Sequence, residues 1–542
     1  MTEERIRRPI SRLEWLTVLA SCIAVSITAT LWSWHDGAML NYGDAVAHLH
    51  IARRVFDSHR PGFTQLGSVW LPFPHLLLIP FVAVYSWWAN GIAGMIPSSL
   101  AYLAGCAGVY RLARHWLRPS SAAVALIFFA TNPNLLYMQT TSMTEPLFLC
   151  EMIWLSVWLV EWREALNNNP PRASHLLCCI AAVLVAAVFT RYDGWVLAFL
   201  AWTSIGIVQL RTSTLRSRAF WITSAVVIGA PIAWCVYNAV IFGDWLDFIR
   251  GPYSASAIEM RTAAPGWPPH PGWHNPWVSF LFFIKAAEMD AAAADWGNTL
   301  LAFALAGTGW AVLTTRRRAF LWTLFLWLPV PFYAYSVAYG SVPIFLPVWW
   351  PHSWYNTRYG MELLPAFALG LGFTAQFMLA AAREFKPRLP RYAASILLTL
   401  IALNAAIVFH EQPLTYVEGI KNVDSRRPFE KQIPPVLRSL LGDRPGGIIL
   451  MDTSVFPQLV ALTGIPLRQT INESDKEFYR DSLVSPATHA AIVLAFDGDE
   501  IDEAVHAHSS GLRAIQRFNA PGQPSGTIYV SDTPPLNKGV KR

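Results

Sequence analysis

The chain is poor in charged residues. Asp, Glu, Lys and Arg make up only 14% of its 542 residues, whereas 54% are hydrophobic and tryptophan occurs 25 times. A soluble protein of this length could not bury so much apolar surface, so the composition excludes a string of ordinary soluble domains and indicates a membrane protein. The net charge of +6 comes mainly from basic residues between apolar runs and does not indicate a nucleic-acid surface.

Cysteine is also scarce, and one kind of glycine-rich motif is missing. All six cysteines fall inside apolar runs, at Cys22, Cys106, Cys150, Cys178, Cys179 and Cys235. We therefore expect no disulfide in an oxidising exterior and no metal site at the adjacent pair. No phosphate-cradling glycine-rich motif opens a helix after residue 410, which gives no support to a nucleotide site there.

Long apolar runs dominate the rest of the chain. A helix needs roughly 20 mainly apolar residues to cross the hydrocarbon core, and eleven runs meet this condition. They lie near residues 13–34, 98–114, 119–138, 147–162, 175–190, 194–210, 219–241, 298–314, 319–339, 359–382 and 392–410. The first follows Arg5, Arg7, Arg8 and Arg12 without a small-residue cleavage site after it, so we interpret it as a retained signal anchor with a cytoplasmic start.

A twelfth apolar run, at residues 70–92, decides the orientation of every later loop. Pro72, Pro74 and Pro80 disfavour a straight span there and favour helices that lie in the membrane interface. If this run does not cross, the basic clusters share the cytoplasmic side, as the positive-inside rule requires. These clusters are Arg111/Arg114/Arg118, Arg163/Arg172, Arg211/Arg216/Arg218, Arg316/Arg317/Arg318 and Arg383/Lys386/Arg388/Arg391. We therefore exclude residues 70–92 from the bilayer core.

The predicted fold is an α-helical polytopic protein of the cell membrane, with about eleven transmembrane helices. Residues 1–410 form the transmembrane domain, with long outer loops at 35–97 and 243–297. Residues 411–542 form a soluble extracytoplasmic domain. Its short apolar strands at 447–452, 490–496 and 527–531 alternate with helical stretches, a pattern typical of a small α/β unit.

The beginning of the first outer loop carries three candidate site residues, Asp44, His48 and Arg54. If a helix starts near Asp44, the spacing of four residues places Asp44 and His48 on one helix face. The alternative is that Asp44 only caps that helix, which is a common role for aspartate before an apolar-periodic segment. The local sequence leaves both interpretations open.

Three further groups fall on the same predicted side of the membrane. Glu145 lies at the mouth of the fourth span, Arg191 and Asp193 interrupt two apolar spans, and Arg358 lies at the edge of the tenth span. Each has a structural alternative, because Glu145 also suits the first turn of a helix and an Arg-Asp pair can neutralise itself at the interface. Together these groups describe a pocket at the membrane surface that can hold a phosphorylated lipid head group and perform acid/base chemistry.

The order of these motifs resembles that of the polytopic glycosyltransferases of the GT-C fold, which include protein mannosyltransferases and the bacterial aminoarabinose transferase. The likeness covers residues 1 to about 410 and rests on Asp44, the juxtamembrane region after it, Thr144-Glu145-Pro146-Leu147 and the run 358–365. Such enzymes move a sugar from a polyprenyl-phosphate carrier to an acceptor outside the cytoplasmic membrane. The resemblance implies the same fold and activity here, with a protein, lipid or glycan acceptor in the cell envelope.

The resemblance also implies roles for the candidate residues. Asp44 is expected to accept the proton of the acceptor hydroxyl during an inverting displacement, and Glu145 to position the acceptor or hold a cation in place. The substrate and its phosphate are expected to be bound by His48, Arg54, His75, Arg191, Asp193 and Arg358.

The sequence departs from the family at residues 70–75, where Trp-Leu-Pro-Phe-Pro-His stands in place of the Lys-Pro-Pro of relatives. In the family that lysine is expected to contact the donor phosphate, and this role then passes to His75, Arg191 or Arg358. Because Asp44 lacks an adjacent second acid, we do not favour a dedicated divalent metal ion and expect no cofactor.

Two other functions remain open. A transporter of a lipid-linked or anionic solute would also hold polar groups in a bundle, but it is typically marked by mid-membrane charges, inverted halves and broken spans. Glu151 is a rare ionisable residue well inside a span. A non-catalytic scaffold whose C-terminal domain binds a partner predicts that Asp44 and Glu145 tolerate substitution.

Overall fold

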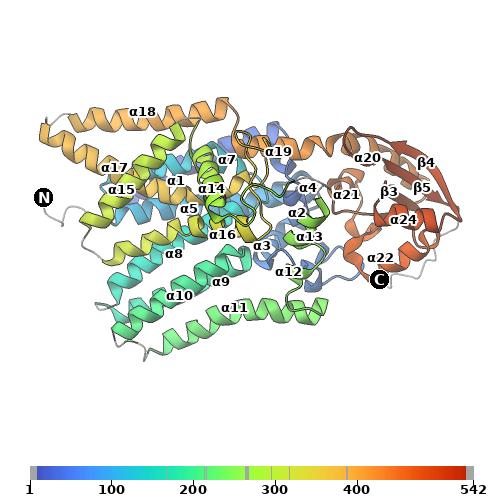
Figure 1. Ribbon diagram of the computed structural model, residues 1–542, viewed down its shortest axis with the longest axis horizontal. Helices are drawn as coiled ribbons and strands as arrows, with labels where there is room; N and C mark the ends of the chain where they lie inside the picture. The colour runs from blue at the N-terminus through green and yellow to red at the C-terminus, as the bar shows by residue number, and fades with distance from the viewer. Residues whose placement is uncertain are drawn as a thin grey trace. The chain divides into compact units, whose positions relative to one another are not determined.

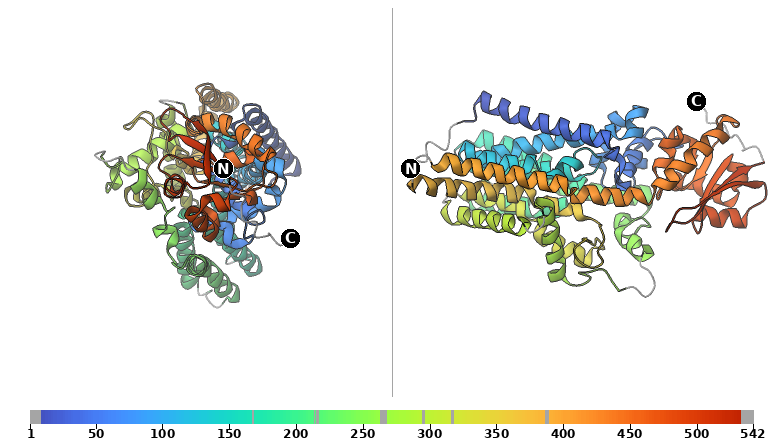
Figure 2. Two further views of the ribbon diagram at one scale, coloured as in Figure 1. Left: turned by 90° about the vertical axis from the view of Figure 1, so that its right-hand side faces the viewer. Right: turned by 90° about the horizontal axis from the view of Figure 1, so that it is seen from above.

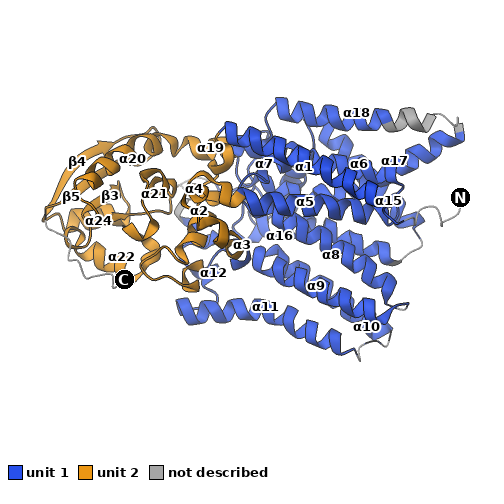
Figure 3. Ribbon diagram, turned by 180° about the vertical axis from the view of Figure 1, so that it is seen from behind, with its two compact units in different colours: residues 1–36, 68–74, 95–418 blue, residues 37–67, 75–94, 419–542 orange. Residues whose placement is uncertain are grey.

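The computed structural model describes residues 9–166, 168–212, 214, 217–262, 268–293, 296–315, 318–385 and 389–532. The chain divides into two compact units, which are coloured separately in Figure 3. Unit 1 comprises residues 1–36, 68–74 and 95–418, and unit 2 comprises residues 37–67, 75–94 and 419–542. Several basic residues used to predict orientation lie outside the described residues, namely Arg5, Arg7, Arg8, Arg216, Arg316, Arg317, Lys386 and Arg388.

Unit 1 is built from long helices that run roughly parallel to one another (Figures 1 and 2). They are α1 (Arg12–His35), α5 (Ile92–Arg114), α8 (Glu145–Ala165), α9 (Pro170–Thr190), α10 (Asp193–Arg211), α11 (Arg218–Phe242), α15 (Trp296–Thr314), α17 (Leu364–Phe385) and α18 (Leu389–His410). Shorter elements connect them: α6 (Pro119–Ala130), α7 (Pro133–Met138), α12 (Asp247–Arg250), α13 (Ala255–Thr262), α14 (Pro276–Ala291), η4 (Arg318–Trp327), α16 (Pro329–Tyr339) and η5 (Thr357–Leu363). Proline begins α6, α7, α9 and α14, a position where its missing N–H leaves no helix bond unmade.

Nine helices among the described residues are long and apolar enough to cross a membrane. This confirms the predicted polytopic helical fold, but the predicted count of eleven spans is not confirmed. The run predicted at 119–138 is two short helices, α6 and α7, because Asn132 caps a new helix by accepting a hydrogen bond from the N–H of Leu135. The run predicted at 147–162 is α8, which is not among these nine helices. Its 21 residues include the acids Glu145, Glu151 and Glu161.

The apolar run at 70–92 does not form one long helix. It contains α3 (Pro72–Val82) and α4 (Tyr85–Asn90), and neither is long enough to cross a bilayer alone. The next helix, α5, begins at Ile92 rather than near the predicted residue 98.

Two glycines allow α15 and α17 to pack closely within unit 1. A Cβ atom on Gly307 would lie 2.0 Å from the carbonyl oxygen of Gly370, and a Cβ on Gly370 would lie 2.3 Å from the carbonyl oxygen of Ala304. Backbone-to-backbone approach of this kind is how small residues pack helices in membranes. A side chain at either position would force the two helices apart.

Unit 2 combines helices of the first outer loop with the C-terminal region. The loop supplies η2 (Ala38–Leu40), α2 (Gly43–Arg54), η3 (Phe63–Leu66), most of α3, and α4. The C-terminal region supplies the end of α19 (Leu414–Asp424), then α20 (Arg427–Gly442), β1 (Ile449–Met451), α21 (Gln458–Thr463), η6 (Leu467–Gln469), β2 (Thr470–Ile471), η7 (Glu473–Asp475), α22 (Glu477–Val484), α23 (Pro486–His489), β3 (Ile492–Phe496), α24 (Glu500–Ala507), β4 (Leu512–Phe518) and β5 (Gly526–Ser531).

The five strands form one mixed sheet in the order β2-β1-β3-β5-β4. Strands β2, β1 and β3 are parallel, with Ile449 opposite Ile492, whereas β5 runs antiparallel to β3 and β4. The parallel half needs crossover helices, which α21 and α22 to α23 provide between consecutive strands. This confirms the predicted small α/β fold, in which the sequence identified β1, β3 and β5 but not β2 and β4.

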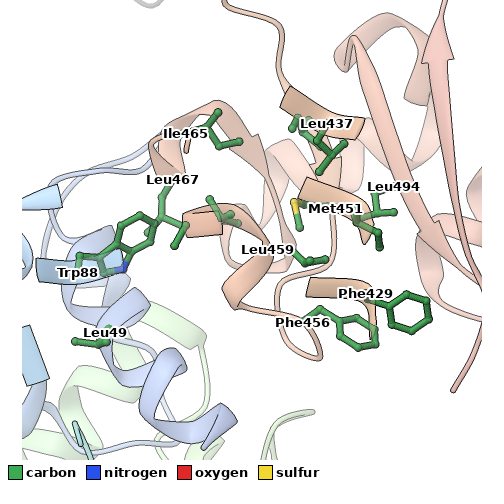
Figure 4. Close-up of a cluster of buried hydrophobic side chains, with 14 of the residues drawn as sticks. Leu49, Trp88, Phe429, Leu437, Met451, Phe456, Leu459, Ile465, Leu467 and Leu494 are labelled. Atoms are coloured by element: carbon green, nitrogen blue, oxygen red, sulfur yellow. The ribbon is translucent and has the colours of Figure 1, made fainter. Parts of the chain in front are cut away.

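Alternate strand residues of unit 2 enter two separate cores. Ile449, Met451 and Leu494 face a core shared with α20 and α21, while Leu450 and Val493 face a core shared with α22 and α24, as the two-residue period of a strand requires. The first core also contains Leu49 of α2 and Trp88 of α4 (Figure 4). Two segments of the predicted outer loop 35–97 therefore share a core with the C-terminal α/β region.

Candidate functional site

Asp44 lies in the first turn of α2, which begins at Gly43, so the predicted helix near Asp44 is present. The N-cap residue is Tyr42, whose side chain makes no capping hydrogen bond. Instead the N–H of Gly43 donates to Oδ1 of Asn422 at 2.8 Å. Asn422 therefore satisfies one of the helix-end donors, and Asp44 is a first-turn acid rather than the N-cap residue.

Arg426 fixes the backbone that leads into α2. Its Nη2 donates to the carbonyl oxygens of Leu40 at 3.2 Å and Asn41 at 2.8 Å, and its Nη1 pairs with Glu430 at 3.0 Å. Burial lowers the pKa of the Arg426 guanidinium, and the charges of Glu430 and Asp44 oppose that shift. Asp44 therefore lies close enough to Arg426 for their charges to interact.

The structure brings His48 and His75 together, although they lie in separate sequence motifs. Nδ1 of His48 and Nε2 of His75 are 2.8 Å apart, a hydrogen bond in which one ring donates. Both rings are buried. Burial, then the charges of His48 and Arg54, lowers the pKa of His75 well below its usual value. A neutral His75 can donate a hydrogen bond to an anion but brings no positive charge.

Arg54 and its neighbour Arg53 make different contacts within unit 2. Nη1 of Arg54 donates to the hydroxyl of Ser474. Arg53 is buried, pairs with Asp57 at 2.7 Å and lies 4.5 Å above the ring of Trp88. Arg53 therefore anchors α2 in the core, whereas the predicted ligand Arg54 reaches η7, which follows β2.

In unit 1, Arg191 is the centre of a buried polar network. Five side-chain oxygens surround its three nitrogens: Asp193 Oδ2 at 3.1 Å from Nε, Thr144 Oγ1 at 3.2 Å and Glu145 Oε1 at 3.3 Å from Nη1, and Tyr333 Oη at 2.7 Å and Glu362 Oε1 at 3.2 Å from Nη2. A guanidinium has five N–H donors, so each of them can face one of these oxygens. Arg191 is thus held by four different segments of the chain.

A tight turn places Arg191 and Asp193 beside each other. Arg191 ends α9 in an extended conformation, and Asp193 begins α10 two residues later. The next residue, Gly194, is packed against α9, since a Cβ on it would lie 2.1 Å from the carbonyl oxygen of Ala187. Glycine at this position is therefore required for the turn that presents the pair.

Arg358 joins the same network through Glu145. Its Nε donates to Oε1 of Glu145 at 3.0 Å, and its Nη1 donates to Oε1 of Glu418 at 2.8 Å. Glu418 also accepts from the backbone N–H groups of Asn356 at 3.0 Å and Thr357 at 2.9 Å, which fixes the start of η5. One oxygen of Glu145 therefore bridges both arginines, while its Oε2 is buried without a hydrogen-bond partner among the described residues.

Three members of this network, Tyr333, Glu362 and Glu418, were not predicted as site residues from the sequence. Tyr333 of α16 accepts from Arg191 and donates to Glu362 at 2.7 Å. Glu362 follows Arg358 by one helical turn and was within the motif already singled out, but Tyr333 lies in an apolar aromatic run without any distinguishing signal. Glu418 lies beyond the predicted membrane domain, so only the fold brings it to Arg358.

Carboxylates outnumber guanidinium groups in the network. Arg191 and Arg358 contact Glu145, Asp193, Glu362 and Glu418. Asp193 and Glu362 also line a small pocket with Phe148, Met152, Leu197, Leu328, Pro329 and Phe332. Within the described ranges, no group of three His, Cys, Asp or Glu side chains is arranged to hold a metal ion.

The predicted site residues thus fall into two groups. Glu145, Arg191, Asp193 and Arg358 form one network in unit 1. Asp44, His48, Arg54 and His75 belong to unit 2, in which His48 and His75 are hydrogen-bonded to each other.

Comparison with known proteins shows the fold. No protein-family model and no curated protein sequence matches the chain. The crystal structure of ArnT from Cupriavidus metallidurans bound to undecaprenyl phosphate is similar with a TM-score of 0.52 and 13% identity, over 96% of this chain and 98% of that one. The apo structure of the same protein gives a TM-score of 0.51 and 12% identity, over 94% and 98%. Across almost its whole length, therefore, the chain has the GT-C fold.

Proposed function

We propose that the protein is a membrane glycosyltransferase that moves a sugar from a polyprenyl-phosphate donor to an acceptor outside the cytoplasmic membrane. The observation that carries this proposal is the bridge of the buried Glu145 between Arg358, which is buried, and Arg191, which is partly buried, in a GT-C fold. Guanidinium groups are the side chains best suited to bind a phosphate in two places at once. The similarity to ArnT, whose structure holds undecaprenyl phosphate, supports a polyprenyl-linked donor.

The proposed reaction is a single displacement. The acceptor hydroxyl oxygen attacks the anomeric carbon, and Asp44 takes its proton. The bond between the anomeric carbon and the phosphate oxygen breaks, and its electron pair leaves with the polyprenyl phosphate. Arg358 and Arg191 stabilise the charge that grows on this phosphate. Because the leaving group departs as an anion, no acid is needed. Because the acceptor attacks in one step from the face opposite the phosphate, the configuration inverts.

The contacts of Arg191 constrain how it can take part. Since its donors already face protein oxygens, a phosphate can bind only by replacing one of them, such as the 3.3 Å contact with Glu145. Glu145 would then pair with Arg358 alone at 3.0 Å. We propose that this exchange couples donor binding to the position of Glu145, which holds the acceptor.

The test is complementation of a deletion strain at matched membrane levels, followed by mass spectrometry of surface glycoconjugates and polyprenyl-phosphate sugars. Wild type is expected to restore one sugar-sized mass increment, and Asp44→Asn to lose it while the lipid-linked donor accumulates. Asp443→Asn is the matched control, because Asp443 is an exposed acid at the end of α20. If Asp44→Asn restores the increment as fully as wild type does, Asp44 is not the base.

A second arm separates transfer from transport. Purified protein in nanodiscs is incubated with lipid-linked sugars extracted from the accumulating strain and with acceptors from the deletion strain. A glycosyltransferase forms the new glycosidic bond and releases polyprenyl phosphate without any membrane-separated compartment. Intact donor and acceptor at the end of this reaction, with an active wild-type strain, would contradict the proposal and favour the transporter.

A further inference from the structure

A second charged cluster of unit 1 lies away from the network around Arg191. It gathers the ends of three helices around Glu161, which is buried near the end of α8. Arg111 in the last turn of α5 lies 2.6 Å from Oε1 of Glu161, and Arg172 in the first turn of α9 lies 3.2 Å from Oε2. His115 lies 3.6 Å from Oε1. Two permanent cations and a histidine therefore meet at one carboxylate.

The donors of this cluster exceed what the carboxylate can accept. Two guanidinium groups carry ten N–H donors, and a carboxylate offers about four lone-pair sites. The Glu161 side chain is only 5% exposed, whereas those of Arg111 and Arg172 are 37% and 56% exposed. The remaining donors thus face outward around a buried acid, and the cluster has a net positive charge.

A neighbouring arginine shows the contrast. Arg114 is buried and pairs with Glu14 at 2.8 Å, and it also donates to the carbonyl oxygen of Leu117. The positive charge of Arg114 is therefore paired with the negative charge of Glu14. Arg111 instead contacts Glu161 and lies 5.5 Å from the ring of Trp154, and its side chain stays 37% exposed.

The position of the cluster at the ends of two apolar helices bears on which ligand it suits. Arg111 is in the last turn and Arg172 in the first turn of helices long and apolar enough to span a membrane, and they share one carboxylate. The end of α5 and the start of α9 therefore lie side by side, and the ends of membrane-spanning helices are where lipid head groups are expected. The sequence predicts that this end is cytoplasmic, which is the leaflet where anionic lipids attract basic residues.

We propose that Arg111 and Arg172, organised by Glu161, bind the phosphate of an anionic phospholipid head group at the end of α5, α8 and α9. Two guanidinium groups can each donate two N–H bonds to phosphate oxygens, and Glu161 keeps the two cations together despite their repulsion. This site is independent of the sugar transfer proposed above.

The experiment measures the melting temperature of the full-length protein in detergent micelles as phosphatidylglycerol or phosphatidylcholine is titrated in. Phosphatidylglycerol is expected to raise the melting temperature at lower concentration than phosphatidylcholine. The double variant Arg111→Gln/Arg172→Gln is expected to weaken the phosphatidylglycerol effect about tenfold or more. The control is Arg383→Gln, an exposed arginine in the last turn of α17, which is expected to behave as wild type.

A single variant and inorganic phosphate complete the experiment. If the double variant does not fold, Arg172→Gln alone serves, since that side chain is largely exposed, and about a threefold weakening or more is expected. Equal effects of the two lipids on wild type, or an unchanged phosphatidylglycerol effect in the variants, would overturn the site. Inorganic phosphate that stabilises wild type as strongly as phosphatidylglycerol would show a soluble-anion site instead of a lipid site.

Discussion

Oε1 of Glu145 accepts a hydrogen bond from Nε of Arg358 at 3.0 Å, although the two residues are 213 positions apart. The same oxygen lies 3.3 Å from Arg191. This single atom therefore connects the start of α8, the turn between α9 and α10, and η5. The residue proposed to position the acceptor is also the residue that holds the two proposed phosphate ligands in place.

Glu145→Gln is expected to destabilise unit 1. The substitution removes the charge that Arg358 and Arg191 share, and loss of one partner of a buried pair such as Glu145 and Arg358 typically costs about 3–5 kcal/mol. The measurement is thermal unfolding in detergent followed by tryptophan fluorescence. The control is Glu164→Gln, which changes an exposed acid in the same helix. Equal melting temperatures for both variants would show that the bridge has no structural role.

Tyr333→Phe tests the hydroxyl that links Arg191 to Glu362. That hydroxyl accepts at 2.7 Å and donates at 2.7 Å inside a buried site, so its removal leaves both partners incompletely satisfied. We expect a loss of about 1–3 kcal/mol in stability. Tyr335→Phe is the matched control, because Tyr335 is 65% exposed on the same helix. A melting temperature for Tyr333→Phe equal to that of the control would contradict this role of the hydroxyl.

The sequence predicted much of unit 1 because spans and charges at their ends follow from composition. Glu145, Arg191, Asp193 and Arg358 were identified because charged side chains at the ends of apolar runs are rare and therefore conspicuous. Tyr333 could not be identified, since one tyrosine among many aromatic residues is ordinary until the fold places its hydroxyl beside Arg191. The break at Asn132 was missed because a single capping residue outweighed an otherwise apolar run.

The stability of unit 2 is expected to fall in acid because of His50. This ring is buried against Trp88, and burial, with Arg54 and Arg53, lowers the pKa of His50 to about 3. Between that value and the unfolded value near 6.5, the unfolded state binds the proton and the folded state does not, so stability is lost as the pH falls. At pH 5 the loss is about 2 kcal/mol.

His50→Phe should therefore reduce the difference in melting temperature between pH 7 and pH 5. The substitution keeps a ring against Trp88 and removes the titrating group. His506→Phe serves as the control, since the side chain of His506 is 74% exposed. An unchanged difference in His50→Phe would show that other groups cause the acid sensitivity.

Glu473 is expected to give unit 2 the opposite pH dependence, so that stability falls as the pH rises. Burial and the nearby charge of Asp452 raise the pKa of Glu473 to about 7, although hydrogen bonds from Thr453 partly oppose this. The folded state then binds the proton more tightly than the unfolded state, so this contribution is present at low pH and is lost as the pH rises through 7.

Glu473→Gln keeps an acceptor for Thr453 and removes the titration. We expect the variant to lose less stability than wild type between pH 6 and pH 8, measured by hydrogen exchange of unit 2 peptides. Glu477→Gln, a nearby change at a side chain that is 69% exposed, should retain the wild-type dependence. A Glu473→Gln profile that also follows wild type would exclude this residue as the source.

Less of unit 2 could be predicted from sequence. The strands β1, β3 and β5 are short apolar runs and were found, whereas β4, with the sequence Leu-Arg-Ala-Ile-Gln-Arg-Phe, is mostly exposed and lacks a clear alternation. The contact between Asn422 and Gly43 joins residues 379 positions apart, and no local pattern indicates it.

The discontinuous make-up of unit 2 has a consequence for biosynthesis. Leu49 and Trp88 leave the ribosome early, but their partners Phe429, Met451 and Leu494 follow only after residues 95–418 have been inserted. Until then the early segments expose apolar surface with nothing to bury it, a condition that favours aggregation or capture by chaperones. A chain that stops after α18 would keep its membrane helices yet leave α2 and α4 without a core, so premature termination should be detected by quality control rather than yield a stable truncated protein.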